Sequence, residues 1–303
     1  MVINCQDSRF SYILKEESNM KTISTFSIVG FDPEKQEWGV AVQSKFLAAG
    51  AAVPFAKAGA GAIATQANAN LDYGELGLIL LQKGYSAKQV VDALVTMDEG
   101  RDQRQVGVVD SRGNSYTYTG KECSDWAGGI CGPNFSCQGN ILVNKETVEA
   151  MAESFQHSEG SLAHRLIEAL DAAQQAGGDS RGRQAAALLV VKEHGSYGGF
   201  NDRMIDLRVD DDPDPIGKLA HLLELHELYF GTTDVKVPME GEICRQVQEA
   251  LKEKGHYKGE ITGIYDDATK YAFSKWCGIE NYEERICEGE FMDEVVLNIL
   301  LGK

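Results

Sequence analysis

Residues 25–70, TFSIVGFDPEKQEWGVAVQSKFLAAGAAVPFAKAGAGAIATQANAN, contain the pattern that decides the fold. An alternating run opens at Thr25, a polar turn follows, and a second strand-like run covers residues 39–44, which predicts a β-hairpin. The rest of the stretch is rich in glycine and alanine, and glycine lets a backbone approach a ligand closely. The stretch therefore predicts a strand that begins at a threonine, followed by accessible backbone N–H groups.

Thr25 is the candidate nucleophile. A threonine that opens a strand is usually there for its β propensity alone. In an N-terminal-nucleophile enzyme, however, the freed α-amine of such a residue serves as its base. That amine has a reference pKa of about 7.7–8.0, and a nearby cation would lower it and leave more of the amine neutral. Lys57 is the candidate cation.

This arrangement is similar to that of the Ntn-hydrolase superfamily, in whose proteasome β subunits a leading threonine, a VAVDSRA-like strand and a lysine occur at comparable spacing. Residues 39–45, GVAVQSK, match that second strand, but Gln43 stands where the pattern has an aspartate. A longer resemblance, over residues 25–222, is to the Ntn-hydrolase-like family called domain of unknown function 1028. It is carried by phrases such as ATQANANLDYG, GRDQRQVGVVDSRG, GGDSRGRQAAALLVV and NDRMIDLRVDD. The family has no established substrate.

These resemblances imply an α+β fold for residues 25–230, a four-layer αββα sandwich with mainly antiparallel sheets. Residues 231–242 contain Pro238 and are expected to form a linker. Residues 243–303 resemble the peptidoglycan-binding domain, a small all-α three-helix module, through a helix ending at Gly255 and a helix capped by Asp266. Residues 1–24 are polar, lack the apolar core of a secretory signal, and are interpreted as a leader.

The catalytic candidates are Thr25, Lys57, Asp179 and Ser180. Asp179 and Ser180 stand in a polar turn that feeds the buried strand AAALLVV, and the Ntn resemblance brings an aspartate and a serine of a late loop near the leading threonine. The simpler alternative is a solvated turn. The candidates for binding the substrate or its oxyanion are Ser44, Thr65, Gln66, Asn68, Asn70 and Arg183. Backbone N–H groups near residues 65–68 would stabilise the oxyanion, and Arg183 would bind a carboxylate.

Composition excludes several classes of function. The net charge of −17 would repel phosphate backbones, so we expect no nucleic-acid partner. No apolar run is long enough to cross a bilayer, so we expect no membrane association. Seven cysteines without a CxxC pair suggest neither a disulfide set nor a zinc site, and the acidic run at 210–214 lacks the ligand spacing of a calcium loop. We therefore expect no metal and no organic cofactor.

The sequence thus predicts an Ntn hydrolase that cleaves a linear, non-peptide amide bond in a small-molecule substrate, with Thr25 as nucleophile after residues 1–24 are removed. The alternative is a non-catalytic binding protein on the same scaffold, which recognises cell-wall fragments or another small ligand through its two domains. The residues before Thr25 and the glutamine at position 43 favour that alternative. The missing signal predicts a cytoplasmic location, and a homo-oligomer is left open.

Overall fold

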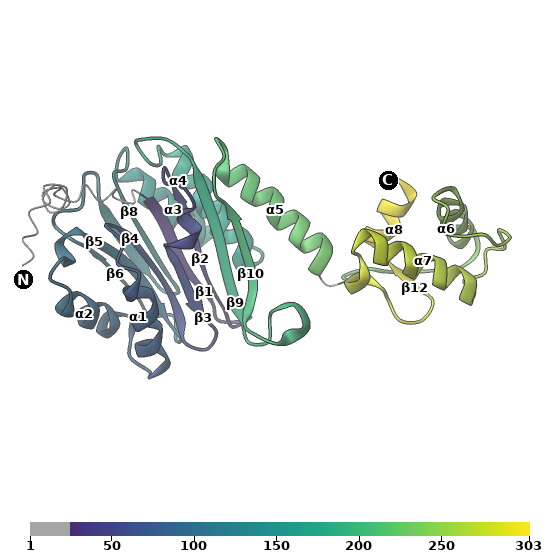
Figure 1. The fold of residues 1–303 in the computed structure, drawn as a ribbon, viewed down its shortest axis with the longest axis horizontal. Helices are drawn as coiled ribbons and strands as arrows, with labels where there is room; N and C mark the ends of the chain where they lie inside the picture. Colours follow the sequence, from purple (N-terminus) through teal and green to yellow (C-terminus); the bar gives the residue numbers. More distant parts are fainter. Residues whose placement is uncertain (1–24, 232) are drawn as a thin grey trace, which may run out of the picture. The chain divides into compact units, whose positions relative to one another are not determined.

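The computed structural model describes residues 25–231 and 233–303 (Figure 1). The chain divides into two compact units, one ending at Leu219 and one running from Ala220 to Lys303. The division falls within helix α5, Pro215–Phe230. The first unit combines antiparallel sheets with helices and the second is mainly helical, which confirms the expected α+β class and the helical C-terminal region.

The larger sheet of the first unit has six antiparallel strands in the order β10-β9-β2-β1-β8-β7. The predicted hairpin forms its centre, with Thr25 opposite Ser44 and Asp32 opposite Glu37. Every residue of both hairpin strands is buried, so the sheet is covered on both faces there. The strands are β1 Thr25–Asp32, β2 Glu37–Ser44, β7 Gly128–Gly132, β8 Phe135–Asn140, β9 Ala185–Lys192 and β10 Arg203–Val209.

A second, four-stranded antiparallel sheet has the order β3-β4-β5-β6. It packs face to face on the larger sheet, because one apolar cluster takes Val29 and Val40 from the larger sheet and Ala62 and Val109 from the smaller one. Its strands are β3 Pro54–Lys57, β4 Gly61–Ala67, β5 Arg104–Asp110 and β6 Ser115–Thr119.

Helices α1 (Asp72–Gln82) and α2 (Ala87–Met97) pack on the smaller sheet, where Tyr73 and Leu94 join Ile63 and Val106 in a second apolar cluster. The predicted capping box opens α2: Ser86 accepts from the Gln89 backbone, and the Gln89 side chain accepts from the Ser86 backbone.

Helices α3 (Glu146–His157) and α4 (Leu162–Gln175) pack on the larger sheet. Strand glycines make room for them, since a Cβ on Gly30 would lie 3.0 Å from Phe155 and one on Gly39 would lie 2.6 Å from Leu166.

The second unit packs three helices around an apolar core that includes Val247, Phe273, Trp276 and Val296. Asp266 caps α7 as predicted, accepting from the Thr269 N–H at 2.9 Å. The elements are α6 Gly241–Glu253, α7 Asp267–Glu280 and α8 Glu294–Leu301, with a small sheet of β11 Lys236–Pro238 and β12 Phe291–Asp293. β11 thus lies within the stretch expected to be a linker.

Short 3-10 turns complete the chain: η1 Ala49–Ala51, η2 Arg101–Gln103, η3 Tyr197–Gly199 and η4 Glu283–Arg285. Among the described residues, no helix has both the length and the apolar character that a bilayer span requires.

Candidate active site

Thr25 is the first residue of β1, which lies inside the larger sheet between β2 and β8. It pairs in register with Ser44 on β2 and Asn140 on β8, and it is fully buried. Its Oγ1 donates a hydrogen bond to Ser44 Oγ at 3.0 Å. From the facing sheet, Gln66 Nε2 donates to the Thr25 carbonyl oxygen at 3.2 Å. The structure therefore brings two of the expected residues, Ser44 and Gln66, into direct contact with the threonine.

A cluster of buried carboxamides joins the two sheets beside Thr25. Gln105 Oε1 accepts from Gln66 Nε2 at 2.8 Å and from Asn140 Nδ2 at 3.0 Å. The Gln105 Nε2 group donates in turn to the Gly139 carbonyl oxygen at 2.8 Å. Sequence reasoning missed Gln105 and Asn140. Each is one of several polar residues in its strand, beside Arg104 and Asp110 in β5 and beside Ser136 and Gln138 in β8, so no sequence pattern distinguishes it.

The polar cluster continues into the space between the sheets. Ser27 Oγ donates to Gln66 Oε1 at 2.6 Å, and Gln138 Nε2 donates to Ser27 Oγ at 2.7 Å. Gln138 occupies space that only a glycine at position 107 leaves, because a Cβ there would lie 1.9 Å from Gln138 Oε1. The buried polar groups thus fix one another, as buried polar side chains must to offset the loss of water.

Asp179 lies at the same end of the larger sheet as Thr25. Its Oδ2 accepts from the Lys45 backbone N–H at 2.9 Å, and Arg181 Nη2 lies 3.0 Å from the same oxygen. Lys45 directly follows Ser44, which is the β2 residue paired with Thr25. The Asp179 carboxylate therefore fixes the end of β2 next to Ser44. Asp179 is a positioning residue in this geometry, and its contacts in the structure are with Lys45 and Arg181.

Ser180 holds the neighbouring strand end. Its Oγ donates to the Ile141 carbonyl oxygen at 2.8 Å, and its N–H donates to the same oxygen at 3.0 Å. Ile141 follows Asn140 and has a φ of 52°, a left-handed conformation that is an outlier for a β-branched residue. Such strain persists only where surrounding contacts impose it, and Ser180 supplies two of those contacts.

Lys57 does not lie beside Thr25. It pairs with Gly61 at the start of β4, whereas Gln66, near the end of β4, contacts Thr25. Five residues of strand span about 16 Å, so the two ends are far apart. Lys57 Nζ instead forms an ion pair with Asp202 Oδ2 at 2.9 Å. Antiparallel pairing thus places Lys57 at the opposite end of the strands from Thr25, too far away to lower the pKa of the Thr25 amine.

Two of the backbone N–H groups expected to stabilise an oxyanion are already paired. Thr65 N–H donates to the Val53 carbonyl oxygen and Asn68 N–H to the Gln103 carbonyl oxygen, both at 3.1 Å. The Thr65 side chain donates to the Asn70 carbonyl oxygen at 3.1 Å. Thr65, Asn68 and Asn70 therefore shape the turn after β4, and the N–H groups of Thr65 and Asn68 are not available to an oxyanion.

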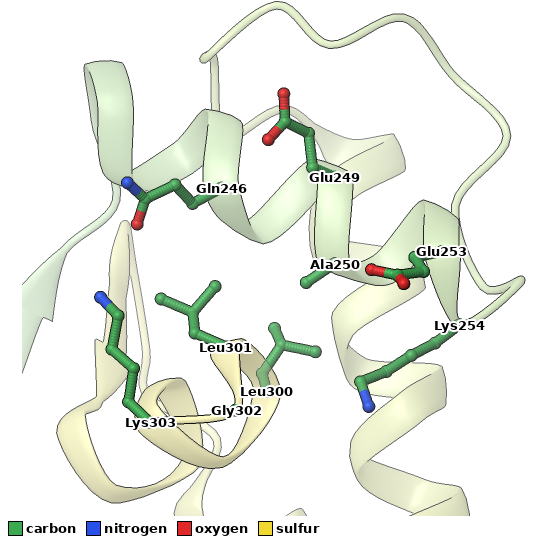
Figure 2. A pocket seen from close by; sticks show the side chains of 9 residues that line it. All are labelled: Gln246, Glu249, Ala250, Glu253, Lys254, Leu300, Leu301, Gly302 and Lys303. Carbon is green, nitrogen blue, oxygen red and sulfur yellow. The ribbon is translucent and has the colours of Figure 1, made fainter.

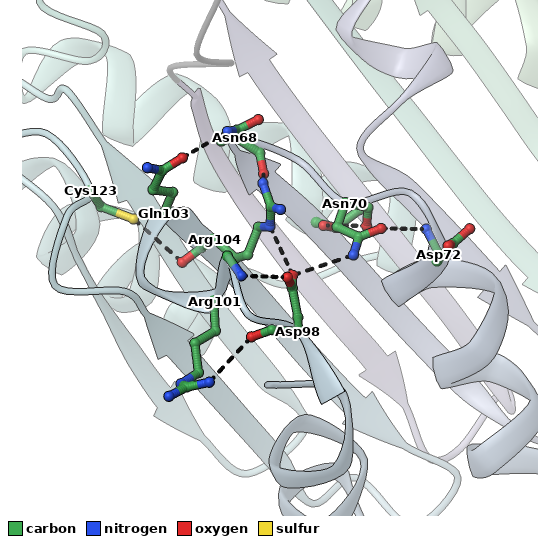
Figure 3. A network of polar contacts seen from close by, with 10 residues as sticks. Asn68, Asn70, Asp72, Asp98, Arg101, Gln103, Arg104 and Cys123 are labelled. Carbon is green, nitrogen blue, oxygen red and sulfur yellow. Dashed lines mark hydrogen bonds and ion pairs between the residues drawn. The ribbon is translucent and has the colours of Figure 1, made fainter. Parts of the chain in front are cut away.

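A salt bridge between Asp98 and Arg104 holds the turn after β4 in place (Figure 3). Arg104 Nε donates to Asp98 Oδ2 at 2.9 Å, and Arg104 Nη1 donates to the Asn68 carbonyl oxygen at 2.6 Å. Asn70 Nδ2 approaches Asp98 Oδ2 at 3.3 Å. Burial alone would raise the pKa of the Asp98 carboxyl, but the hydrogen bonds from Arg104, the Gly100 backbone and Asn70 outweigh burial and lower that pKa to about 2.

Arg183 makes a weaker contact with the acidic run. Its Nη1 lies 3.5 Å from Asp214 Oδ1, and both side chains are largely exposed. The Arg183 carbonyl oxygen accepts from Lys45 Nζ at 3.1 Å. Arg183 therefore lies at the same end of the larger sheet as Thr25, where its guanidinium faces the Asp214 carboxylate.

Gln43, which replaces the expected aspartate, is fully buried one residue before Ser44. Neighbouring strand residues point to opposite faces, so its side chain lies on the helix-covered face, away from the Thr25 hydroxyl. Neither of its carboxamide atoms has a hydrogen-bond partner within the described part of the chain. An unsatisfied buried polar group of this kind costs about 1–3 kcal/mol.

No set of three or more His, Cys, Asp or Glu residues in residues 25–231 and 233–303 is arranged to hold a metal ion.

Comparison with known proteins gives two family matches. Residues 25–219 match the family described as "Family of unknown function (DUF1028)". Residues 232–300 match the family described as "Putative peptidoglycan binding domain". A crystal structure of a DUF1028 protein from Silicibacter pomeroyi is similar, with 32% sequence identity and a TM-score of 0.62, and the match covers 67% of this chain and 89% of that one. None of the curated proteins matches the chain.

Proposed function

The chain belongs to the DUF1028 family of unknown function, and we propose that its first unit is an N-terminal-nucleophile hydrolase of linear, non-peptide amide bonds. The nucleophile is Thr25, exposed as a free N-terminus once residues 1–24 are removed. One observation carries the proposal: Thr25 opens a central strand of the sheet and is in contact there with the Ser44 hydroxyl and the Gln66 carboxamide. The predicted cleavage, at Ser24–Thr25, lies partly outside the described residues.

The layering of the first unit supports the same proposal. Its two antiparallel sheets face each other, and each carries a helix pair on its outer face. This succession agrees with the four-layer αββα sandwich that the Ntn-hydrolase resemblance implies. In such a sandwich the nucleophile would stand at the end of the sheets, where a substrate can enter between them.

The reaction follows from the Thr25 contacts. The α-amine takes the proton of Oγ1 as that oxygen attacks the amide carbon, and the resulting ammonium returns the proton to the leaving amine. Water then hydrolyses the ester, regenerating the hydroxyl. The amine, with a reference pKa of about 7.7–8.0, is partly neutral near pH 7.5 without a neighbouring lysine. Ser44 orients the hydroxyl, while Asp179 and Ser180 fix the strand ends around it.

Oxyanion stabilisation is assigned to a side-chain donor, because the backbone N–H groups of Thr65 and Asn68 are paired. Asn140 lies directly opposite Thr25 and is held by Gln105 at 3.0 Å, which makes it the donor best fixed in place. Loss of one such donor typically costs about 10²–10³ in rate. Asn140→Ala should therefore lower kcat while leaving KM largely unchanged.

The test is hydrolysis of a panel of linear amides by the purified protein, followed by mass spectrometry of the products. Thr25→Ala should abolish turnover, and Thr25→Ser should retain part of it. Thr96→Ala is the matched control, since Thr96 lies on the exposed surface of α2, where its hydroxyl only contacts the Asp92 carbonyl oxygen. Activity that survives Thr25→Ala would contradict the proposal.

A second candidate function is ligand binding without catalysis. Two departures from the nucleophile pattern favour it: Lys57 is separated from Thr25, and the Gln43 carboxamide has no partner among residues 25–231 and 233–303. In that case no amide of the panel is turned over, and Thr25→Ala leaves ligand affinity unchanged. For the second unit, the family match to residues 232–300 supports binding of peptidoglycan fragments.

A further inference from the structure

The second unit carries a groove between the last turns of α6 and the end of α8, with a cavity volume of about 600 Å³ (Figure 2). Its lining residues are Gln246, Glu249, Ala250, Glu253, Lys254, Leu300, Leu301, Gly302 and Lys303. This volume lies in the range of small-ligand sites, about 300–1,000 Å³. The groove belongs entirely to the second unit.

The floor of the groove is apolar and fixed. Leu300 and Leu301 point from α8 toward Ala250 on α6 (Figure 2). Leu300 is part of the buried core of the unit, and Ala250 and Leu301 pack against that core. Helix α8 ends in a left-handed Gly302 with a φ of 69°, whose N–H donates to the Ile299 carbonyl oxygen at 3.2 Å. The apolar floor is thus held in place by the core beneath it.

Charged side chains stand at both ends of this floor. Lys303 lies with Gln246 at one end, and Glu253 lies with Lys254 at the other (Figure 2). The C-terminal ends of both helices meet the groove, and each carries a partial negative charge. None of the lining residues, all of them in the described range, is aromatic. The groove therefore offers ionic partners for both an amine and a carboxylate, and no ring on which a sugar could stack.

We propose that this groove binds the peptide arm of a peptidoglycan fragment, a short chain with small aliphatic side chains and free carboxylate and amine groups. The inference rests on the cell-wall binding proposed for the second unit and assigns its site and ligand class. The aliphatic side chains lie on Ala250, Leu300 and Leu301. A carboxylate pairs with Lys254 or Lys303, and an amine pairs with Glu253. The glycan strand stays outside the groove.

The experiment uses the full chain and isothermal titration calorimetry with two probes: the tetrapeptide released from peptidoglycan, and a glycan oligomer from which the peptides have been removed. The wild type should bind the tetrapeptide and not the glycan. Lys254→Glu, which reverses an exposed charge in the groove, and Ala250→Arg, which fills its floor, should each weaken tetrapeptide binding at least tenfold. Lys275→Glu is the control, because Lys275 is an exposed residue of α7 outside the groove.

The outcomes separate the two proposals. If the tetrapeptide binds but Lys254→Glu and Ala250→Arg leave its affinity unchanged, the groove is not the site, although cell-wall binding stands. If only the glycan binds, the ligand class is wrong. If intact peptidoglycan sacculi fail to retain even the wild type, cell-wall binding itself fails. Circular dichroism of Lys254→Glu shows whether a loss of affinity reflects loss of folding.

Discussion

Replacing Asp98 by asparagine should destabilise the first unit in a strongly pH-dependent way. The Asp98 side chain is 13% exposed, and its carboxylate accepts hydrogen bonds from Arg104 at 2.9 Å and from the Gly100 N–H at 2.8 Å. Asparagine keeps the size and one acceptor oxygen but removes the charge. Arg104 would then be left half-buried without its anionic partner.

The magnitude follows from the pKa of Asp98, which the fold lowers from 3.8 to about 2. Each pKa unit corresponds to about 1.4 kcal/mol, so the carboxylate stabilises the folded state by about 2.5 kcal/mol at pH 7. Because the folded pKa is depressed, this stabilisation is complete above the unfolded value, starts to fall near pH 4 and is lost below pH 2. At pH 3 about half of it should remain.

The assay is urea unfolding at pH 7, 5 and 3. Unfolding is monitored by hydrogen exchange of peptides from β4 and β5, because these peptides report on the first unit alone. Wild type and Asp98→Asn should differ by about 2.5 kcal/mol at pH 7 and by about half of that at pH 3. Asp92→Asn is the control, because Asp92 pairs with Lys88 on the exposed face of α2, where such pairs contribute about 0–1 kcal/mol. An equal destabilisation by Asp98→Asn at all three pH values would show that the Asp98 charge does not stabilise the folded state.

Three further outcomes are expected. Gly107→Ala should lower the free energy of unfolding of the first unit by about 1–3 kcal/mol in urea unfolding, because the new Cβ would collide with Gln138. Arg285→Ala should cost the second unit about 3–5 kcal/mol in the same assay, because it leaves the Asp293 carboxylate, 3.0 Å from Arg285 Nη1, buried and unpaired. Cys277 should resist maleimide labelling at pH 8, since burial, then the Glu283 and Asp293 carboxylates, raise its pKa to about 12.

Each of these has its own control. Gly278→Ala, inside α7 with its nearest neighbour 3.8 Å from the new Cβ, should stabilise by about 0.5–1 kcal/mol. Lys275→Ala removes an exposed cation of α7 and should be nearly neutral. A loss of stability in Lys275→Ala equal to that in Arg285→Ala would contradict the role of the buried ion pair. Cys131, which is exposed, should label faster than Cys277, and labelling of Cys277 at the same rate without denaturant would contradict its burial.

Local features of the fold were predictable because short-range patterns specify them. The alternation around residues 25–44 gave the hairpin, and the spacing of Ser86 and Gln89 gave the start of α2. Both depend on residues that are close in the chain. Asp266 at the start of α7 is a third case.

The assembly of the site was harder to predict, because it depends on which ends of distant strands meet. Lys57 has a suitable spacing from Thr25, yet pairing with Gly61 carries it to the other end of β4. Gln105 and Asn140 are buried polar residues of separate strands, and only the packing of the two sheets joins them. The hydrogen bonds of the Thr65 and Asn68 N–H groups could not be predicted either, because their acceptors, Val53 and Gln103, lie on other segments of the chain.

The central claim is that Thr25 becomes a free N-terminal residue, and the most direct measurement is the intact mass and N-terminal sequence of the purified protein. We expect a chain that begins at Thr25. If the threonine takes part in its own release, the Thr25→Ala variant should retain residues 1–24. A wild-type chain that keeps residues 1–24 and still hydrolyses amides would rule out Thr25 as the nucleophile, because its amine would be blocked.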